Sequence, residues 1–228
     1  MRNTDKIKSY YAKRLGSKRS ASLLTQVGKT VNGVDISNEQ FSTIIESIIS
    51  SLHINKDDII IDIGCANGLV TREIAKECKK IQGIDISKDL IAIAQEHSMS
   101  DNIRYTEANC LKYDYKGFNK AYMYEALQHL KYKELPTLLD RLKRAETISM
   151  VLLGSIPDAE RLFNFYNNKA RREAYYTSLE NGEPHLGNWW YMEHIEVVCR
   201  KKGIKANFIS QDKTLHTAHY RFDALLEL

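Results

Sequence analysis

The feature that most constrains this chain is the run IIIDIGCANG at residues 59–68, where an apolar stretch leads straight into a turn bounded by two glycines. A short continuous apolar run is typical of a strand covered on both faces of a sheet. Gly64 lets the backbone turn sharply and approach a ligand, and Gly68 lets a helix start close to the sheet. The run therefore predicts a buried strand, a tight loop and a helix, with a ligand site at the loop.

From residue 58 to residue 155, strand-like apolar stretches alternate with amphipathic stretches typical of helices. This alternation predicts right-handed crossovers and a parallel sheet with helices on both faces. Two further strands are expected at 204–212 and 217–228, close enough in sequence to pair antiparallel. We therefore expect an α/β, Rossmann-like, seven-stranded, mostly parallel sheet with an antiparallel edge strand, N-terminal helices and a helical insert after the fifth strand.

Composition excludes several classes of protein. The net charge of +4 is mild, whereas nucleic-acid binding usually shows a stronger and more concentrated basic excess. The first residues lack the apolar core of a signal peptide, and no run of about 18 apolar residues is present, so no membrane partner is expected. The cysteines lack metal-type spacing, which predicts reduced thiols, a cytoplasmic protein and no metal site. The four cysteines are Cys65, Cys78, Cys110 and Cys199.

A dinucleotide fingerprint, G-x-G-x-x-G, would need a glycine at position 66, where Ala66 stands. The remaining pattern, Asp62-x-Gly64-x-x-x-Gly68, resembles motif I of the class I S-adenosylmethionine-dependent methyltransferases. The sequence YMYEALQHL at 122–130 is similar to that family's fourth strand and the loop after it. The second expected strand ends at an acidic residue, Asp85. These features occur in the family's order, which makes the resemblance specific.

The resemblance implies S-adenosyl-L-methionine as cofactor and assigns roles along the loops. Asp85 would accept hydrogen bonds from both ribose hydroxyls, and Asn109, where the family commonly has Asp, would accept from the adenine amino group. Asp62 would either fix the loop amides or accept from the cofactor's amino group. The complete expected set is Asp62, Gly64, Cys65, Ala66, Gly68, Asp85, Ile86, Asn109, Cys110 and Tyr124, with the backbone of Cys65 and Ala66 beside the methionine part.

The resemblance also implies one methyltransferase domain over residues 1–228. We expect an N-terminal helical lid or cap at 1–54, a cofactor-binding core at 55–155, a helical substrate-covering insert at 156–191, and a last helix with edge strands at 192–228.

Candidates for a catalytic base are few. Glu125 and His129 lie four residues apart after the fourth strand, and His185 lies in a loop between a proline and a glycine. A hydroxyl acceptor requires a base, whereas an anionic acceptor requires none. His129 also has a purely structural interpretation, in which it orders its loop.

The acceptor is expected to be a small molecule. YEALQ stands where enzymes that methylate exocyclic base amines usually carry Asn/Asp-Pro-Pro-Tyr/Phe. The tyrosine-rich insert offers rings for a small polar ligand, and Lys169, Arg171 and Arg172 either meet a phosphate or are solvated. VGKTVNG and HYRFDALL are similar to methyltransferases of bacterial surface polysaccharides. We expect transfer to an oxygen of a sugar, nucleotide-linked precursor or phosphate-bearing metabolite.

The alternative is an RNA-directed methyltransferase or RNA-binding protein that uses two basic clusters. One cluster is Lys169, Arg171 and Arg172, and the other is Lys13, Arg14, Lys18 and Arg19.

Overall fold

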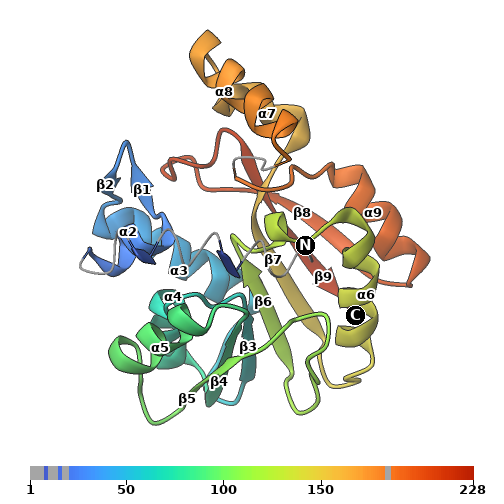
Figure 1. The fold of residues 1–228 in the computed structure, drawn as a ribbon. Helices are drawn as coiled ribbons and strands as arrows, with labels where there is room; N and C mark the ends of the chain where they lie inside the picture. Colours follow the sequence, from blue (N-terminus) through green and yellow to red (C-terminus); the bar gives the residue numbers. More distant parts are fainter. Residues whose placement is uncertain (1–7, 10–14, 17–20, 183–185) are drawn as a thin grey trace.

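The computed structural model describes residues 8–9, 15–16, 21–182 and 186–228. At its centre is a seven-stranded sheet with the strand order β5-β4-β3-β6-β7-β9-β8 (Figure 1). Neighbours from β5 to β7 pair in parallel, and β9 pairs antiparallel with both β7 and β8. The expected fold class is confirmed. The strands are β3 Ile59–Ile63, β4 Lys80–Asp85, β5 Ile103–Glu107, β6 Lys120–Tyr124, β7 Met150–Pro157, β8 Lys205–Ser210 and β9 Arg221–Glu227.

Helices cover both faces of the sheet. One core cluster joins α6 and α9 to the sheet through residues such as Leu138 and Ile195. A second cluster on the other face joins α3, α4 and α5 through residues such as Ile48, Ile74 and Ile91. The helices that form these two layers are α3 Asn38–Leu52, α4 Leu69–Ile74, α5 Lys88–His97, α6 Leu135–Lys143 and α9 Met192–Lys201, with single 3₁₀ turns at η1 Ala75–Glu77, η2 Leu127–His129 and η3 Tyr132–Glu134.

The central strands end together at one edge of the sheet. In the parallel register Asp62 of β3 lies beside Gly83 of β4 on one side and Tyr122 of β6 on the other. Because β3 and β6 consist almost entirely of buried residues, their polar groups at this edge are held by the core. The loops after β3, β4 and β6 therefore meet where ligands bind in open parallel sheets.

The described part of the N-terminal segment packs beside the glycine turn. It contains α2 Leu23–Val27 and the hairpin β1 Thr30–Val31 with β2 Val34–Asp35. Asn32 and Gly33, both with positive φ (51° and 83°), form the turn of the hairpin. Leu15, Leu23 and Val27 pack with Leu90, Ile93 and Ala66. The basic cluster at Lys13, Arg14, Lys18 and Arg19 lies outside the described residues.

The insert after β7 is helical, with η4 Ala159–Arg161, α7 Leu162–Phe165 and α8 Lys169–Glu180. Figure 1 shows α8 projecting from the body, and it has no buried residue. An aromatic cluster around Tyr166, Trp189 and Tyr220 joins the insert to the start of β9. Arg171 and Arg172 donate to the carbonyls of Phe165 and Tyr166 and lie beside phenylalanine rings. These two arginines therefore stabilise the junction between α7 and α8.

Across the described ranges, no helix combines the length and apolarity that a bilayer crossing requires. Nor do three or more His, Cys, Asp or Glu side chains in this part of the chain come together as a metal site would need.

Candidate active site

A cleft opens at the carboxyl ends of β3, β4, β5 and β6. Nine of the ten expected cofactor residues line it: Asp62, Gly64, Cys65, Ala66, Asp85, Ile86, Asn109, Cys110 and Tyr124. Both candidate bases from the β6 loop, Glu125 and His129, line the same cleft. Gly68 is not among the described residues that line it.

Each glycine of the turn is required by its neighbours. Gly64 has a φ of 82°, and a Cβ there would lie 2.6 Å from the Cβ of Ala126, so the loop after β6 packs directly on the turn. Gly68 has a φ of 74°, and a Cβ would lie 2.3 Å from the hydroxyl of Tyr105. Gly64 therefore leaves backbone facing the cleft, whereas Gly68 lets α4 begin close against the sheet.

Asp85 fixes the backbone of the glycine turn. One carboxylate oxygen accepts the N–H of Ala66 at 3.0 Å, and the other accepts the N–H of Ser87 at 2.8 Å. Ala66 has a φ of 50°, a left-handed conformation that this bond helps to hold. Burial raises the pKa of Asp85, although the amide donors of Ser87 and Ala66 oppose the shift. Asp85 thus links the end of β4 to the loop that follows β3.

Asp62 is buried at 2% exposure beneath the cleft. Its Oδ2 accepts from the hydroxyls of Thr71 at 2.6 Å and Tyr122 at 2.7 Å. Burial raises its pKa to about 7, because two neutral hydroxyls only partly offset the loss of solvent. In the described structure the hydrogen-bond partners of Asp62 are hydroxyls, whereas the loop amide of Ala66 donates to Asp85.

The loop after β5 supplies the far wall of the cleft. The side-chain oxygen of Asn109 accepts the N–H of Leu111 at 2.8 Å, which leaves that oxygen a second lone pair for a ligand. The carbonyl of Cys110 accepts from the hydroxyl of Tyr115 at 2.8 Å. Both residues are therefore held by local bonds before any ligand binds.

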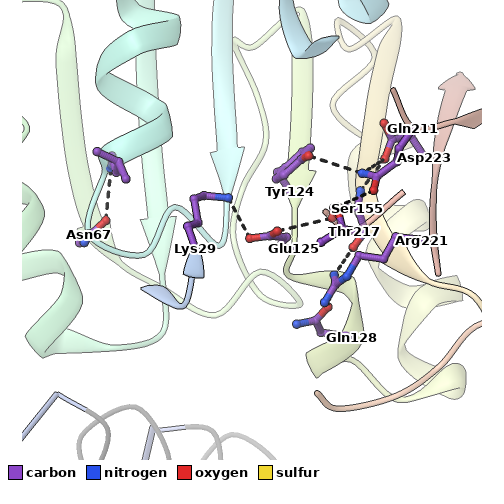
Figure 2. Close-up of polar contacts among 11 residues, drawn as sticks. Lys29, Asn67, Tyr124, Glu125, Gln128, Ser155, Gln211, Thr217, Arg221 and Asp223 are labelled. Carbon is purple, nitrogen blue, oxygen red and sulfur yellow. Dashed lines mark hydrogen bonds and ion pairs between the residues drawn. The ribbon is translucent and has the colours of Figure 1, made fainter. Parts of the chain in front are cut away.

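Glu125 and Lys29 form an ion pair across the cleft. Lys29 Nζ lies 2.8 Å from Glu125 Oε2 and 5.0 Å from the centre of the Tyr124 ring (Figure 2). Burial alone would raise the pKa of Glu125, but Lys29 and Arg221 outweigh it and hold the pKa below its ordinary value. Glu125 is therefore a charged group at neutral pH and a weak base.

A buried polar network stands behind Glu125 (Figure 2). Ser155 Oγ lies 3.5 Å from Glu125 Oε1, and the Ser155 N–H donates to Asp223 at 2.6 Å. Arg221 donates to the Ser155 carbonyl and, at 2.8 Å, to Gln128. Glu125 directly follows β6 and Ser155 lies within the neighbouring strand β7, and both have a φ of 55°. Left-handed conformations at non-glycine residues cluster at functional sites, because the surrounding structure must hold them.

The histidines behave differently from one another. Burial, with a smaller contribution from Arg221, lowers the pKa of His129 to about 4, so its imidazole is neutral at physiological pH. His185 lies outside the described residues. Burial lowers the pKa of His216, and the charge of Glu125 opposes this shift.

Several residues of this site were not among those expected from the sequence. Lys29 comes from the segment before the N-terminal hairpin and joins the cleft through tertiary contact alone. Arg221 and Asp223 did carry a signal, because two charges spaced by two in an otherwise apolar strand mark a polar partner on one face.

Comparisons with known proteins agree with this geometry. A family model described as "Methyltransferase domain" matches residues 60–146. A probable cobalt-precorrin-6B C(15)-methyltransferase (decarboxylating) of Methanocaldococcus jannaschii is 36% identical over 72 residues, 32% of this chain and 38% of the relative. A probable ribosomal RNA small subunit methyltransferase A of Methanococcus aeolicus is 37% identical over 81 residues, 34% of this chain and 30% of the relative. This chain thus matches about a third of the length of these curated relatives.

Solved structures share the whole fold. Magnesium protoporphyrin IX methyltransferase (ChlM) from Synechocystis PCC 6803 with bound SAM has a TM-score of 0.66 and 12% identity, covering 100% of this chain and 97% of that one. The DhpI-SAM-HEP complex has a TM-score of 0.64 and 11% identity, covering 96% and 95%. The further similarity to polysaccharide-associated methyltransferases is not shown by these comparisons.

The family match therefore covers the same segment as the glycine turn, Asp85 at the end of β4 and the ordered strands. Both solved structures are described as complexes with S-adenosylmethionine, the expected cofactor. Residues 60–146 of this chain match the methyltransferase-domain family, and the chain as a whole has the fold of the S-adenosylmethionine-dependent methyltransferases named above.

Proposed function

We propose that this protein transfers the methyl group of S-adenosylmethionine to an oxygen of a small polar acceptor: a sugar, a nucleotide-linked precursor or a phosphate-bearing metabolite. The observation that carries the transferase assignment is the cleft at the carboxyl edge, where bare backbone at Gly64 and the carboxylate of Asp85 face the same space. An adenosyl ligand needs both a close backbone approach and an acceptor for its ribose hydroxyls.

The residues of the cleft fit this cofactor. Asp85 would accept from the ribose hydroxyls, Asn109 would meet the adenine edge, and the backbone of Cys65 and Ala66 would flank the methionine part. The bound sulfonium supplies an electrophilic methyl group and leaves as a neutral thioether, so the protein needs no acid for departure. Its main tasks are to hold the acceptor in line and to exclude water.

Among the proposed acceptors, the electrostatics of the acceptor side favour those whose oxygen arrives already ionised over a sugar hydroxyl, which would need a base. Glu125, with its lowered pKa, and His129, with a pKa of about 4, are both weak bases at neutral pH. Carboxylate and phosphate-type oxygens need no deprotonation. Val27 and Lys29 of the N-terminal segment line the cleft, which supports 1–54 as a cap. The aromatic cluster at the base of 156–191 supports the insert as the cover of the acceptor.

The test is methyl transfer from S-adenosylmethionine with a tritiated methyl group. The purified protein would be incubated with nucleoside diphosphate sugars, sugar phosphates, small carboxylic acids and total RNA. We expect label in a small-molecule acceptor and measurable calorimetric binding of S-adenosylhomocysteine. Absence of binding of both donor and product would contradict the transferase assignment.

One observation keeps an RNA-directed activity as the second candidate. Ribosomal RNA methyltransferases are among the relatives, although the likeness covers 34% of this chain. This candidate predicts label in RNA and an RNA affinity that falls steeply with salt. Label confined to small molecules would remove it.

A further inference from the structure

A single buried cation enters the cofactor cleft from outside the matched segment. Within the described chain, Lys29 is the one lysine or arginine that lines the cleft. Its side chain is 5% exposed, and its amine lies 2.8 Å from Glu125 Oε2. A buried ammonium group is costly unless it is paired, so this placement needs an explanation.

The backbone of Lys29 is fixed on both sides. Its N–H donates to the Leu24 carbonyl at 2.9 Å, and its carbonyl accepts the N–H of Ile36 at 3.0 Å. The preceding helix α2 is attached to the glycine turn, because Asn67 Nδ2 donates to the Leu23 carbonyl at 2.9 Å. Lys29 is therefore held against the same loop that begins at Gly64.

The pairing of Lys29 with Glu125 leaves capacity for a ligand. An ammonium group has three donors, and one of them serves Glu125. Lys29 lines the cleft together with Asp62 of β3 and with Glu125, which follows β6, and its charge acts to lower the pKa of both carboxyl groups. An anionic group bound at this point would meet a cation already held in place by a carboxylate.

The proposed cofactor carries such a group. Its amino-acid end has a carboxylate, and the expected position of that end is beside Cys65 and Ala66, which line the cleft with Lys29. We propose that Lys29 binds the carboxylate of the methionyl part of the cofactor, with Glu125 as the positioning residue that orients the ammonium group. This inference depends on the proposed function and extends the cofactor site to the N-terminal segment.

The experiment compares two ligands that differ in the amino-acid part. Calorimetry would measure S-adenosylhomocysteine, which has the carboxylate, and 5′-methylthioadenosine, which lacks the whole amino-acid end. We expect Lys29→Met to weaken S-adenosylhomocysteine by about 10- to 100-fold and to leave 5′-methylthioadenosine unchanged, as expected for one lost charge-assisted hydrogen bond. Lys8→Met is the matched control, because Lys8 forms an exposed pair with Glu107 at 2.6 Å and lies outside the cleft lining.

The outcomes separate the inference from the function. A wild-type protein that binds neither ligand contradicts the proposed function. If the wild type binds and Lys29→Met loses no affinity, or loses the same affinity for both ligands, only the assignment of Lys29 is overturned. The proposed function is not affected by that result. If Lys29→Met fails to fold, the wild-type protein is compared with S-adenosylhomocysteine and its decarboxylated analogue. A preference of about tenfold or more for the carboxylate supports the inference, and equal affinity overturns it.

Discussion

The carboxylate of Asp223 accepts the backbone N–H of Ser155 at 2.6 Å, in the irregular stretch where β7 pairs with β9. Two residues earlier on β9, Arg221 donates to the carbonyl of the same Ser155. The two side chains thus satisfy both peptide groups of a buried residue whose φ is 55°. The backbone held in this way points the Ser155 hydroxyl toward Glu125.

Removal of this acceptor should destabilise the fold. Asp223→Ala leaves the Ser155 N–H buried without a partner, and we expect the free energy of unfolding to fall by about 1–3 kcal/mol. Asp223→Asn keeps an oxygen that can accept the bond, so its loss should be smaller. Urea unfolding measures both, and equal losses in the two variants would argue against the bond.

Asp62 should make the stability of the ligand-free protein depend on pH. Its pKa is raised from 3.8 to about 7 in the folded protein, so between these values the folded state holds a proton that the unfolded state has released. Stability from this group is present below about pH 4 and is lost as pH rises toward 7, by a few kcal/mol, at roughly 1.4 kcal/mol per pKa unit. Asp62→Asn should therefore gain stability relative to the wild type over this window. Urea unfolding of both proteins from about pH 4 to 8 measures the difference, and a constant difference would contradict the raised pKa.

Gly64→Ala should cost more than the same change at an open position. Both Gly64 and Gly117 have positive φ (82° and 86°), but a Cβ at 64 meets Ala126 at 2.6 Å, whereas at 117 nothing lies within 4 Å. We expect Gly117→Ala to cost about 1–2 kcal/mol from backbone strain, and Gly64→Ala to cost about 1–3 kcal/mol more. Chemical unfolding checks stability, and calorimetry with S-adenosylhomocysteine checks the cleft. Similar costs at both sites would mean that the loop after β6 moves away from the added methyl group with little loss of stability.

Asp85→Ala should weaken the binding of S-adenosylhomocysteine by about 1.5–3 kcal/mol, because charge-assisted bonds to the ribose and the bond to the Ala66 amide are both lost. Calorimetry measures the affinity. The exposed Asp101→Ala is the control, and its affinity should equal that of the wild type. An Asp85 variant with wild-type affinity would refute the ribose role.

The pH dependence of methyl transfer should be shallow. Since His129 has a pKa of about 4 and Glu125 has a lowered pKa, neither changes charge between about pH 6 and 9. With an acceptor that arrives ionised, kcat at saturating cofactor should show no titration of His129 or Glu125 over that range, whereas kcat/KM for the cofactor is expected to follow Asp62, whose pKa in the ligand-free cleft is about 7. His129→Ala at saturating cofactor should preserve the flat profile. A wild-type rise near pH 6–7 that disappears in His129→Ala would instead identify His129 as a base with a pKa near 6.5.

The sequence by itself determined the sheet and the cofactor edge, because both depend on local patterns. The apolar runs of β3 and β6 require burial on two faces, and Gly64, Asp85 and Asn109 stand at strand ends that a parallel sheet must bring together. Only the tertiary structure decided the rest. Lys29 reaches Glu125 across 96 residues of chain, and Arg221 reaches Gln128 across 93. Such pairings, and the pKa values that burial sets at Asp62 and His129, depend on packing between distant segments, which no local pattern encodes.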